Sequence, residues 1–141
     1  MSLTVGNVGM GNSYPSKVAF GAKLPTEDVL QVVTGRLLKE GGMNGIYKVC
    51  DEMTGRSNMT HELPEVSRQC TEVLTERFPV LNTIIENSKK FFDGTKKSLE
   101  EITKWKDEQV KLFGAKEADV PEFAPNNFEI ERKTAELFSR K

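Results

Sequence analysis

Residues 27–40 read EDVLQVVTGRLLKE, and the apolar spacing in this stretch decides the fold class. Val29, Val33 and Leu37 recur at four-residue steps, which is the pattern of an amphipathic helix. Thr26 stands directly before the stretch and can cap its first turn. A glycine inside the stretch weakens the helix, and the two glycines that follow it are a strong stop. We expect one helix over residues 27–40.

Further segments carry one-sided apolar patterns or helix start and stop signals. Ser98 and Glu101 have the spacing of a capping box, so the helix expected around them is firm from Ser98 onward. The chain shows no internal repeat, no sustained heptad pattern and no convincing strand alternation. We therefore expect an all-α protein, a compact bundle of five or six short helices. The other expected helices cover about 43–53, 64–77, 79–92, 95–113 and 128–140.

Two segments differ in composition from the helices. The first 24 residues contain four glycines, scattered apolar side chains and no acidic residue. Glycine makes both helix and strand costly, so this part is expected to be an extended, Gly-rich arm. In residues 120–125, VPEFAP, each proline disfavours helix at the residue before it. The expected organisation is an N-terminal arm (1–24), a helical core domain (25–114), and an extended Pro-containing segment with the C-terminal helix (115–141).

Composition narrows the function classes. The chain has 141 residues, which is the size of one domain, with 20 basic and 21 acidic residues and a net charge of -1. A nucleic-acid-binding protein usually carries a clear basic excess, because phosphate neutralisation supplies most of its affinity. No apolar run approaches the roughly 20 residues that a membrane span needs. The start of the chain also lacks the apolar core of a signal peptide.

Cys50 and Cys70 are the two cysteines of the chain. Both fall at apolar positions of expected helices, where cysteine behaves as a small apolar residue. Their number and spacing match neither a disulfide framework nor a paired metal site. We expect buried free thiols, as in a reducing compartment. With no export signal, the expected location is the cytoplasm or a particle assembled inside the cell.

The residues capable of catalysis or metal binding are scattered. His61 is the only histidine, and the second histidine of a zinc-protease motif is absent. The glycines of residues 6–11 do not have the spacing of a phosphate-binding loop. Neighbouring acidic pairs such as Glu100 and Glu101 are typical of a solvated helix face. We expect no enzymatic activity, no catalytic residue, no cofactor-binding residue and no metal ligand.

The region from Lys89 to Lys106 is the best candidate for nucleic-acid binding. Lysines alternate there with aromatic residues, a combination that can bind single strands. However, the stretch from Lys89 to Lys111 contains seven lysines and five acidic residues, which leaves only +2. A nucleic-acid-associated helical protein is therefore one alternative function. A small-molecule-binding domain, with its pocket between helices, is another.

Apolar residues outside the helices give the most informative functional signal. Phe20, Val120 and Phe123 lie in segments expected to be irregular. Two interpretations remain open, since these side chains either pack onto the protein's own helices or dock into a partner.

The leading hypothesis is a non-enzymatic helical adaptor or structural subunit of a larger protein assembly. Viral or phage structural proteins and accessory subunits of cellular complexes both fit this description by analogy of fold. We expect protein partners, either in a homo-oligomer or in a hetero-assembly, contacted through the terminal arms. The expected contact residues are Tyr14, Phe20, Trp105, Phe123 and Phe128.

Overall fold

A computed structural model describes residues 22–139 of the chain, so Tyr14 and Phe20 lie outside the described residues. Within this range the chain forms six α-helices, one short 3-10 helix and two short strands. The expected all-α class is confirmed, because residues 22–139 are mostly helical and form just one small sheet of two strands. In chain order the elements are β1 (Ala22–Pro25), α2 (Thr26–Thr34), α3 (Gly42–Thr54), η1 (Thr60–Glu62), α4 (Leu63–Arg77), α5 (Val80–Phe91), α6 (Leu99–Phe113), β2 (Glu117–Val120) and α7 (Asn127–Ser139).

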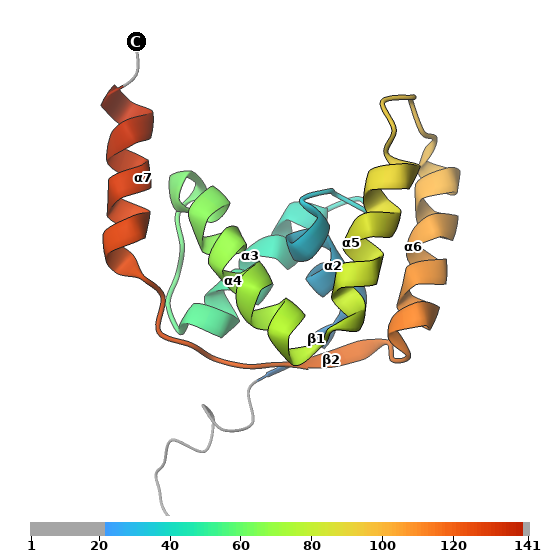
Figure 1. Cartoon of the computed structure of the whole chain (residues 1–141), viewed down its shortest axis with the longest axis horizontal. Helices are drawn as coiled ribbons and strands as arrows, with labels where there is room; N and C mark the ends of the chain where they lie inside the picture. Colours follow the sequence, from blue (N-terminus) through green and yellow to red (C-terminus); the bar gives the residue numbers. More distant parts are fainter. Residues whose placement is uncertain (1–21, 140–141) are drawn as a thin grey trace, which may run out of the picture.

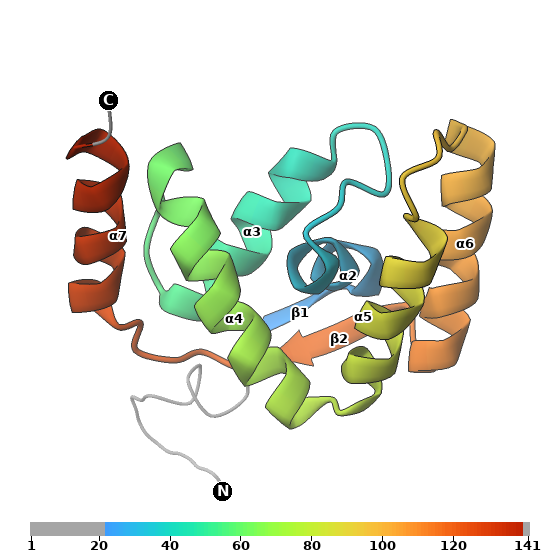
Figure 2. The same ribbon diagram turned by 45° about the horizontal axis from the view of Figure 1, so that its top comes forward.

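Helix α2 is the centre of the core. It packs against α3, α4, α5 and α6 and against both strands, and the other elements surround it (Figures 1 and 2). Val29 and Leu30 are fully buried, and Val32 and Val33 are almost so. Apolar side chains on all sides of a helix indicate that it is enclosed. The stretch that decided the fold class is thus also the stretch around which the chain folds.

The remaining helices form two ends. Helices α5 and α6 lie side by side at one end of the molecule, while α7 stands at the opposite end beside α4 (Figure 1). A strap of residues 121–126 runs from β2 across the base of the molecule to α7 (Figure 1). The two ends are therefore joined through the core and through this strap.

The first helix is shorter than expected. Helix α2 stops at Thr34 because Gly35 takes a left-handed conformation, with φ of 69°, and its N–H caps the carbonyl of Gln31. The expected continuation to residue 40 is therefore wrong. Residues 35–41 form a loop instead, which leaves Leu37 half exposed while Leu38 is buried. The other helices begin and end close to their expected bounds, and α6 starts at Leu99 after the Ser98 cap.

The two strands were not expected from the sequence. They pair antiparallel, with Ala22 opposite Val120 and Leu24 opposite Ala118. Leu24, Ala118 and Val120 face the core, whereas Lys23 and Asp119 form an outward ion pair at 3.4 Å. Each strand has four residues, too few for an alternating pattern to stand out.

Val120 and Phe123, the two described apolar residues expected in irregular segments, both pack onto the core. Val120 is buried in the core, and the half-buried Phe123 packs against it. The Phe123 N–H donates to the carbonyl of Met53 at the end of α3, with N···O of 2.8 Å. Of the two open interpretations, packing onto the protein's own helices describes both side chains. Ala22 pairs with Val120, so residues 1–21 join the body of the protein beside the strap.

Candidate protein-interaction site

Helix α7 is the least embedded of the described helices. Among its apolar side chains, Ile130 is buried, whereas Phe128 is 73% exposed and Leu137 is 51% exposed. Phe128 is the most exposed large apolar side chain among the described residues. Aromatic side chains are enriched at protein–protein contacts, so Phe128 is the first described residue to consider as a contact point. Phe128 is also one of the contact residues expected from the sequence.

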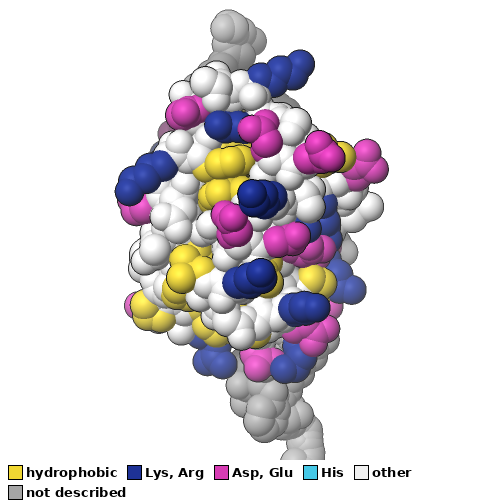
Figure 3. Space-filling model, turned by 90° about the vertical axis from the view of Figure 1, so that its right-hand side faces the viewer, with side chains coloured by type: hydrophobic (Ala, Val, Ile, Leu, Met, Phe, Trp, Pro, Cys, Tyr) yellow, Lys and Arg dark blue, Asp and Glu magenta, His cyan; other side chains and the backbone are white. Residues whose placement is uncertain are grey.

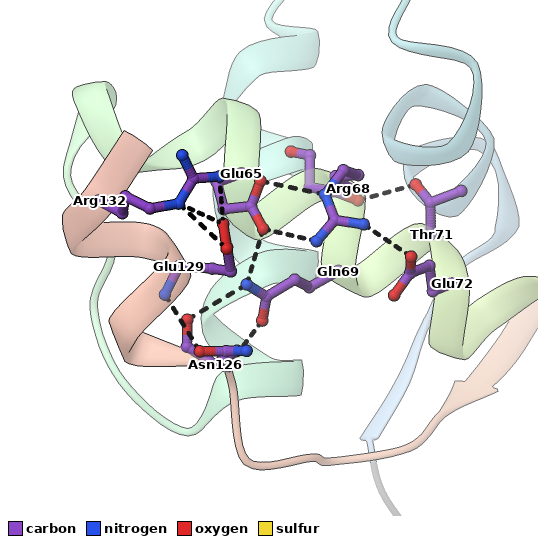
Figure 4. A network of polar contacts seen from close by, with 9 residues as sticks. Glu65, Arg68, Gln69, Thr71, Glu72, Asn126, Glu129 and Arg132 are labelled. Atoms are coloured by element: carbon purple, nitrogen blue, oxygen red, sulfur yellow. Dashed lines mark hydrogen bonds and ion pairs between the residues drawn. The ribbon is translucent and has the colours of Figure 1, made fainter. Parts of the chain in front are cut away.

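A pair of hydrogen bonds fixes the start of α7 to α4. Gln69 accepts from the N–H of Asn126 through Oε1, at 2.8 Å, and its Nε2 donates to the carbonyl of Asn126, at 3.3 Å (Figure 4). Asn126 Oδ1 in turn accepts from the N–H of Glu129, at 3.1 Å, and so caps the first turn of α7. Gln69 is buried, so neither of its amide atoms has ready access to water. This arrangement, the Gln69–Asn126 clamp, sets where α7 begins.

Ion pairs surround the clamp. On α4, Arg68 forms a two-point contact with the buried Glu65, at 3.0 and 2.7 Å, and also reaches Glu72 (Figure 4). Gln69 Nε2 donates to Glu65 as well, at 2.9 Å, which links the ion pair to the clamp. On α7, Arg132 contacts Glu129 and Glu136. Each of these ion pairs lies within one helix, so α7 is attached to the body by the Gln69–Asn126 clamp and by the buried side chain of Ile130.

The acidic groups of this network predict a pH dependence. The hydrogen bonds from Arg68 hold the pKa of Glu65 below its ordinary value, and Arg132 lowers the pKa of Glu129 in the same way. A carboxyl group whose pKa is lowered on folding stabilises the folded state above its unfolded pKa, and this contribution is lost as pH falls through the folded pKa. We expect stability to decrease from about pH 5 to about pH 3. Urea unfolding of wild type and Glu65→Gln at several pH values checks this. The variant should have a lower free energy of unfolding at pH 7, and this free energy should change less with pH than in wild type.

The clamp can be tested by removing Gln69. In Gln69→Ala the N–H of Asn126 loses its acceptor, which should cost about 1–2 kcal/mol and loosen α7. Hydrogen exchange should then become faster in α7 and stay unchanged in α5 and α6. The matched control is Glu72→Ala, one turn along α4, whose side chain contacts only the exposed Arg68. Equal exchange rates in α7 of Gln69→Ala and wild type would contradict the role of the clamp.

Trp105 is placed differently from Phe128. It is buried on α6 and stacks on Phe91, with ring centroids 5.1 Å apart and 12° between the planes. Phe92 meets it edge-on, at 5.6 Å. Lys97 lies over the outer face of this group, 4.8 Å from the Phe91 centroid, and Arg36 lies over Phe92, at 4.7 Å. Trp105 thus packs within the end formed by α5 and α6.

Three of the six lysines between Lys89 and Lys106 form ion pairs. Lys106 reaches Glu27 at 2.9 Å, Lys89 reaches Glu86 at 3.1 Å, and Lys97 reaches Asp93 at 3.8 Å. On the side of the molecule formed by α6, basic and acidic side chains are interspersed (Figure 3). A phosphate backbone favours a surface of one sign. The arrangement of charges on α6 therefore does not support the alternative function of nucleic-acid binding.

Surface hollows near α6 offer little to a small molecule. One is lined only by side chains of that single helix, among them Thr103 and Asp107, so it is a furrow along the helix rather than a space between helices. Among the described residues, no group of three or more His, Cys, Asp or Glu side chains could hold a metal ion. Nor is any helix in residues 22–139 both long and apolar enough to cross a bilayer.

Comparison with known proteins gives one match. Residues 24–84 match the family model described as "Domain of unknown function (DUF7736)". The matched range runs from β1 to the first turns of α5, so it contains α2, α3 and α4 and lies outside α6, β2 and α7. No curated protein and no solved structure matches the chain. The match covers the central part of the core and assigns no activity.

The sequence proposed Phe128 as a contact residue, which stays a prediction, and gave no sign of how α7 is held. The capping role of Asn126 follows from its place before an apolar-periodic segment. The partnership with Gln69 does not, since the two residues are 57 positions apart. A glutamine within the polar face of an expected helix carries no local signal that it is buried.

Proposed function

We propose that this protein is a non-enzymatic helical adaptor or structural subunit that binds neighbouring protein chains through α7. The observation that carries the proposal is the exposure of Phe128 on α7, a helix whose only described buried apolar side chain is Ile130. Burying an aromatic ring in a partner's groove is a common source of affinity for a helix. The proposal includes a location inside the cell or in a particle assembled there.

Residues 1–21 are the second proposed contact element. They join the body at Ala22, beside the strap that leads to α7. Tyr14 and Phe20 of this segment, together with Phe128, are the proposed contact residues. Trp105 and Phe123 pack against the protein's own core, so we do not include them among the main proposed contact residues.

The test is the absolute mass in solution, measured by light scattering after size exclusion over a range of protein concentrations and salt. We expect the mass to rise above 15.8 kDa with concentration. Phe128→Ser should weaken this association at least tenfold while leaving far-UV circular dichroism unchanged. The matched control is Leu112→Ser, which removes a 47% exposed apolar side chain from the opposite end of the molecule.

The results distinguish self-assembly through α7 from binding to a different protein chain. Association that Phe128→Ser weakens and Leu112→Ser does not supports self-assembly through α7. Equal loss in both variants contradicts a specific site. A wild-type mass of 15.8 kDa at every concentration contradicts self-assembly. The contact would then be to a different chain, which must be identified and must lose binding in Phe128→Ser.

A further inference from the structure

The two cysteines lie at the contact between α3 and α4. Cys50 is on α3 and Cys70 on α4, and both are fully buried among the core side chains. The Sγ of Cys50 is 3.7 Å from the Oγ of Ser67. Ser67 and Cys70 are three residues apart on α4, so they share one face of that helix. The Cys50 sulfur therefore faces the same stripe of α4 that carries Cys70.

The chemistry of the pair agrees with this placement. Each thiol is the largest influence on the pKa of the other, since the neighbouring Cys70 lowers the pKa of Cys50 and the neighbouring Cys50 raises that of Cys70. The Ser67 hydroxyl also lowers the pKa of Cys50. The thiolate is the reactive form of cysteine, so Cys50 is the sulfur better prepared to attack. Cys70 remains a thiol beside it and is placed to act as the second partner.

We propose that Cys50 and Cys70 are a redox pair that closes into an intramolecular disulfide when the protein meets a peroxide. The Cys50 thiolate attacks one peroxide oxygen, so that an S–O bond forms, the O–O bond breaks and hydroxide leaves. Cys70 then attacks the Cys50 sulfur, the S–S bond forms, and the sulfenic oxygen leaves as water. Overall two thiols lose two electrons and two protons, and one hydrogen peroxide becomes two waters.

The disulfide would link the two helices that hold the proposed interaction site. The strap is bonded to Met53 near the end of α3, and the clamp residue Gln69 precedes Cys70 on α4. A covalent link between residues 50 and 70 also restricts the unfolded chain. We therefore expect the oxidised protein to unfold at a higher temperature than the reduced protein. This expectation does not depend on whether α7 binds a partner.

The experiment treats the native full-length protein with hydrogen peroxide, removes the oxidant, and then alkylates it in denaturant with N-ethylmaleimide. We expect an intact mass lower by about 2 Da with no alkyl adducts, and a peptide map that joins Cys50 to Cys70. Dithiothreitol should restore two alkylation sites and the original melting temperature. Because both sulfurs are buried, the reaction is expected to be slow and to need local opening.

The control is Cys70→Ser, which should leave Cys50 as a sulfenic or more oxidised acid and give no internal cross-link. Since this variant also changes the core, the peptide map of the oxidised wild-type protein is the result that supports or contradicts the proposed disulfide. Disulfide-linked dimers, or oxygen addition on wild-type Cys50 without loss of the Cys70 thiol, would overturn it. So would an internal bond that forms only in unfolded protein, or one that lowers the melting temperature.

Discussion

Gly45→Ala should be among the most destabilising single-methyl additions to this protein. Gly45 lies in the first turns of α3, and a Cβ there would overlap the carboxyl group of Asp28 on α2. Asp28 is buried and is held by Lys39 at 3.0 Å, so it has little room to move. Overpacking a tight helix contact and displacing a buried ion pair together should cost about 3 kcal/mol. Urea unfolding monitored by circular dichroism measures the loss.

The ordinary effect of alanine in a helix is opposite in sign, which makes the test decisive. Alanine is favoured over glycine in a helix interior by about 1 kcal/mol, so an uncrowded site would become more stable. Asn44→Ala, at the exposed neighbouring position, is the control and should change stability by less than about 0.5 kcal/mol. The double variant Asp28→Ser with Gly45→Ala should recover part of the loss. A stabilised Gly45→Ala protein would show that α2 and α3 are not in such close contact.

The same contact shows why the close approach of α2 and α3 could not be read from the sequence. From the sequence, Gly42 belongs to a pair of glycines that stops a helix, and a glycine at position 45 only lowers helix propensity. In the structure they are the positions where α3 approaches α2, and Gln31 donates to the carbonyl of Gly42 at 3.0 Å. Gln31 also accepts from the N–H of Leu38, at 2.9 Å, and so shapes the loop after α2. Local propensity does not contain information about partners eleven residues or more away.

What the sequence did predict depends on local signals. The Ser98 cap and the apolar period of α2 each act within one or two turns, and each has the expected effect. Gly35 was recognised as a weakness, but its left-handed conformation ended the helix. The candidate site divides in the same way. The apolar residues of α7 could be listed from the sequence, whereas the Gln69–Asn126 clamp that fixes the start of this helix depends on the tertiary fold.

Trp105→Ala should cause the largest loss of stability at the end formed by α5 and α6. Trp105 is 7% exposed, and its ring packs against both Phe91 at the end of α5 and Phe92 directly after it. Removing a buried indole leaves a cavity and breaks two aromatic contacts, which should cost about 3–5 kcal/mol. Urea unfolding followed by far-UV circular dichroism measures the change, since Trp105 is the only tryptophan and the variant has no indole fluorescence.

Trp105→Ala also tests whether Trp105 stabilises the core or contacts a partner, as the sequence suggested. Leu99→Ala is the control on the same helix, because Leu99 is 52% exposed and its removal should cost less than about 0.5 kcal/mol. Trp105→Phe retains a ring and should lose distinctly less stability than Trp105→Ala. If Trp105→Ala unfolds like wild type but associates less, the ring is a contact residue after all. A large loss of stability instead leaves Phe128 as the main described aromatic residue available to a partner.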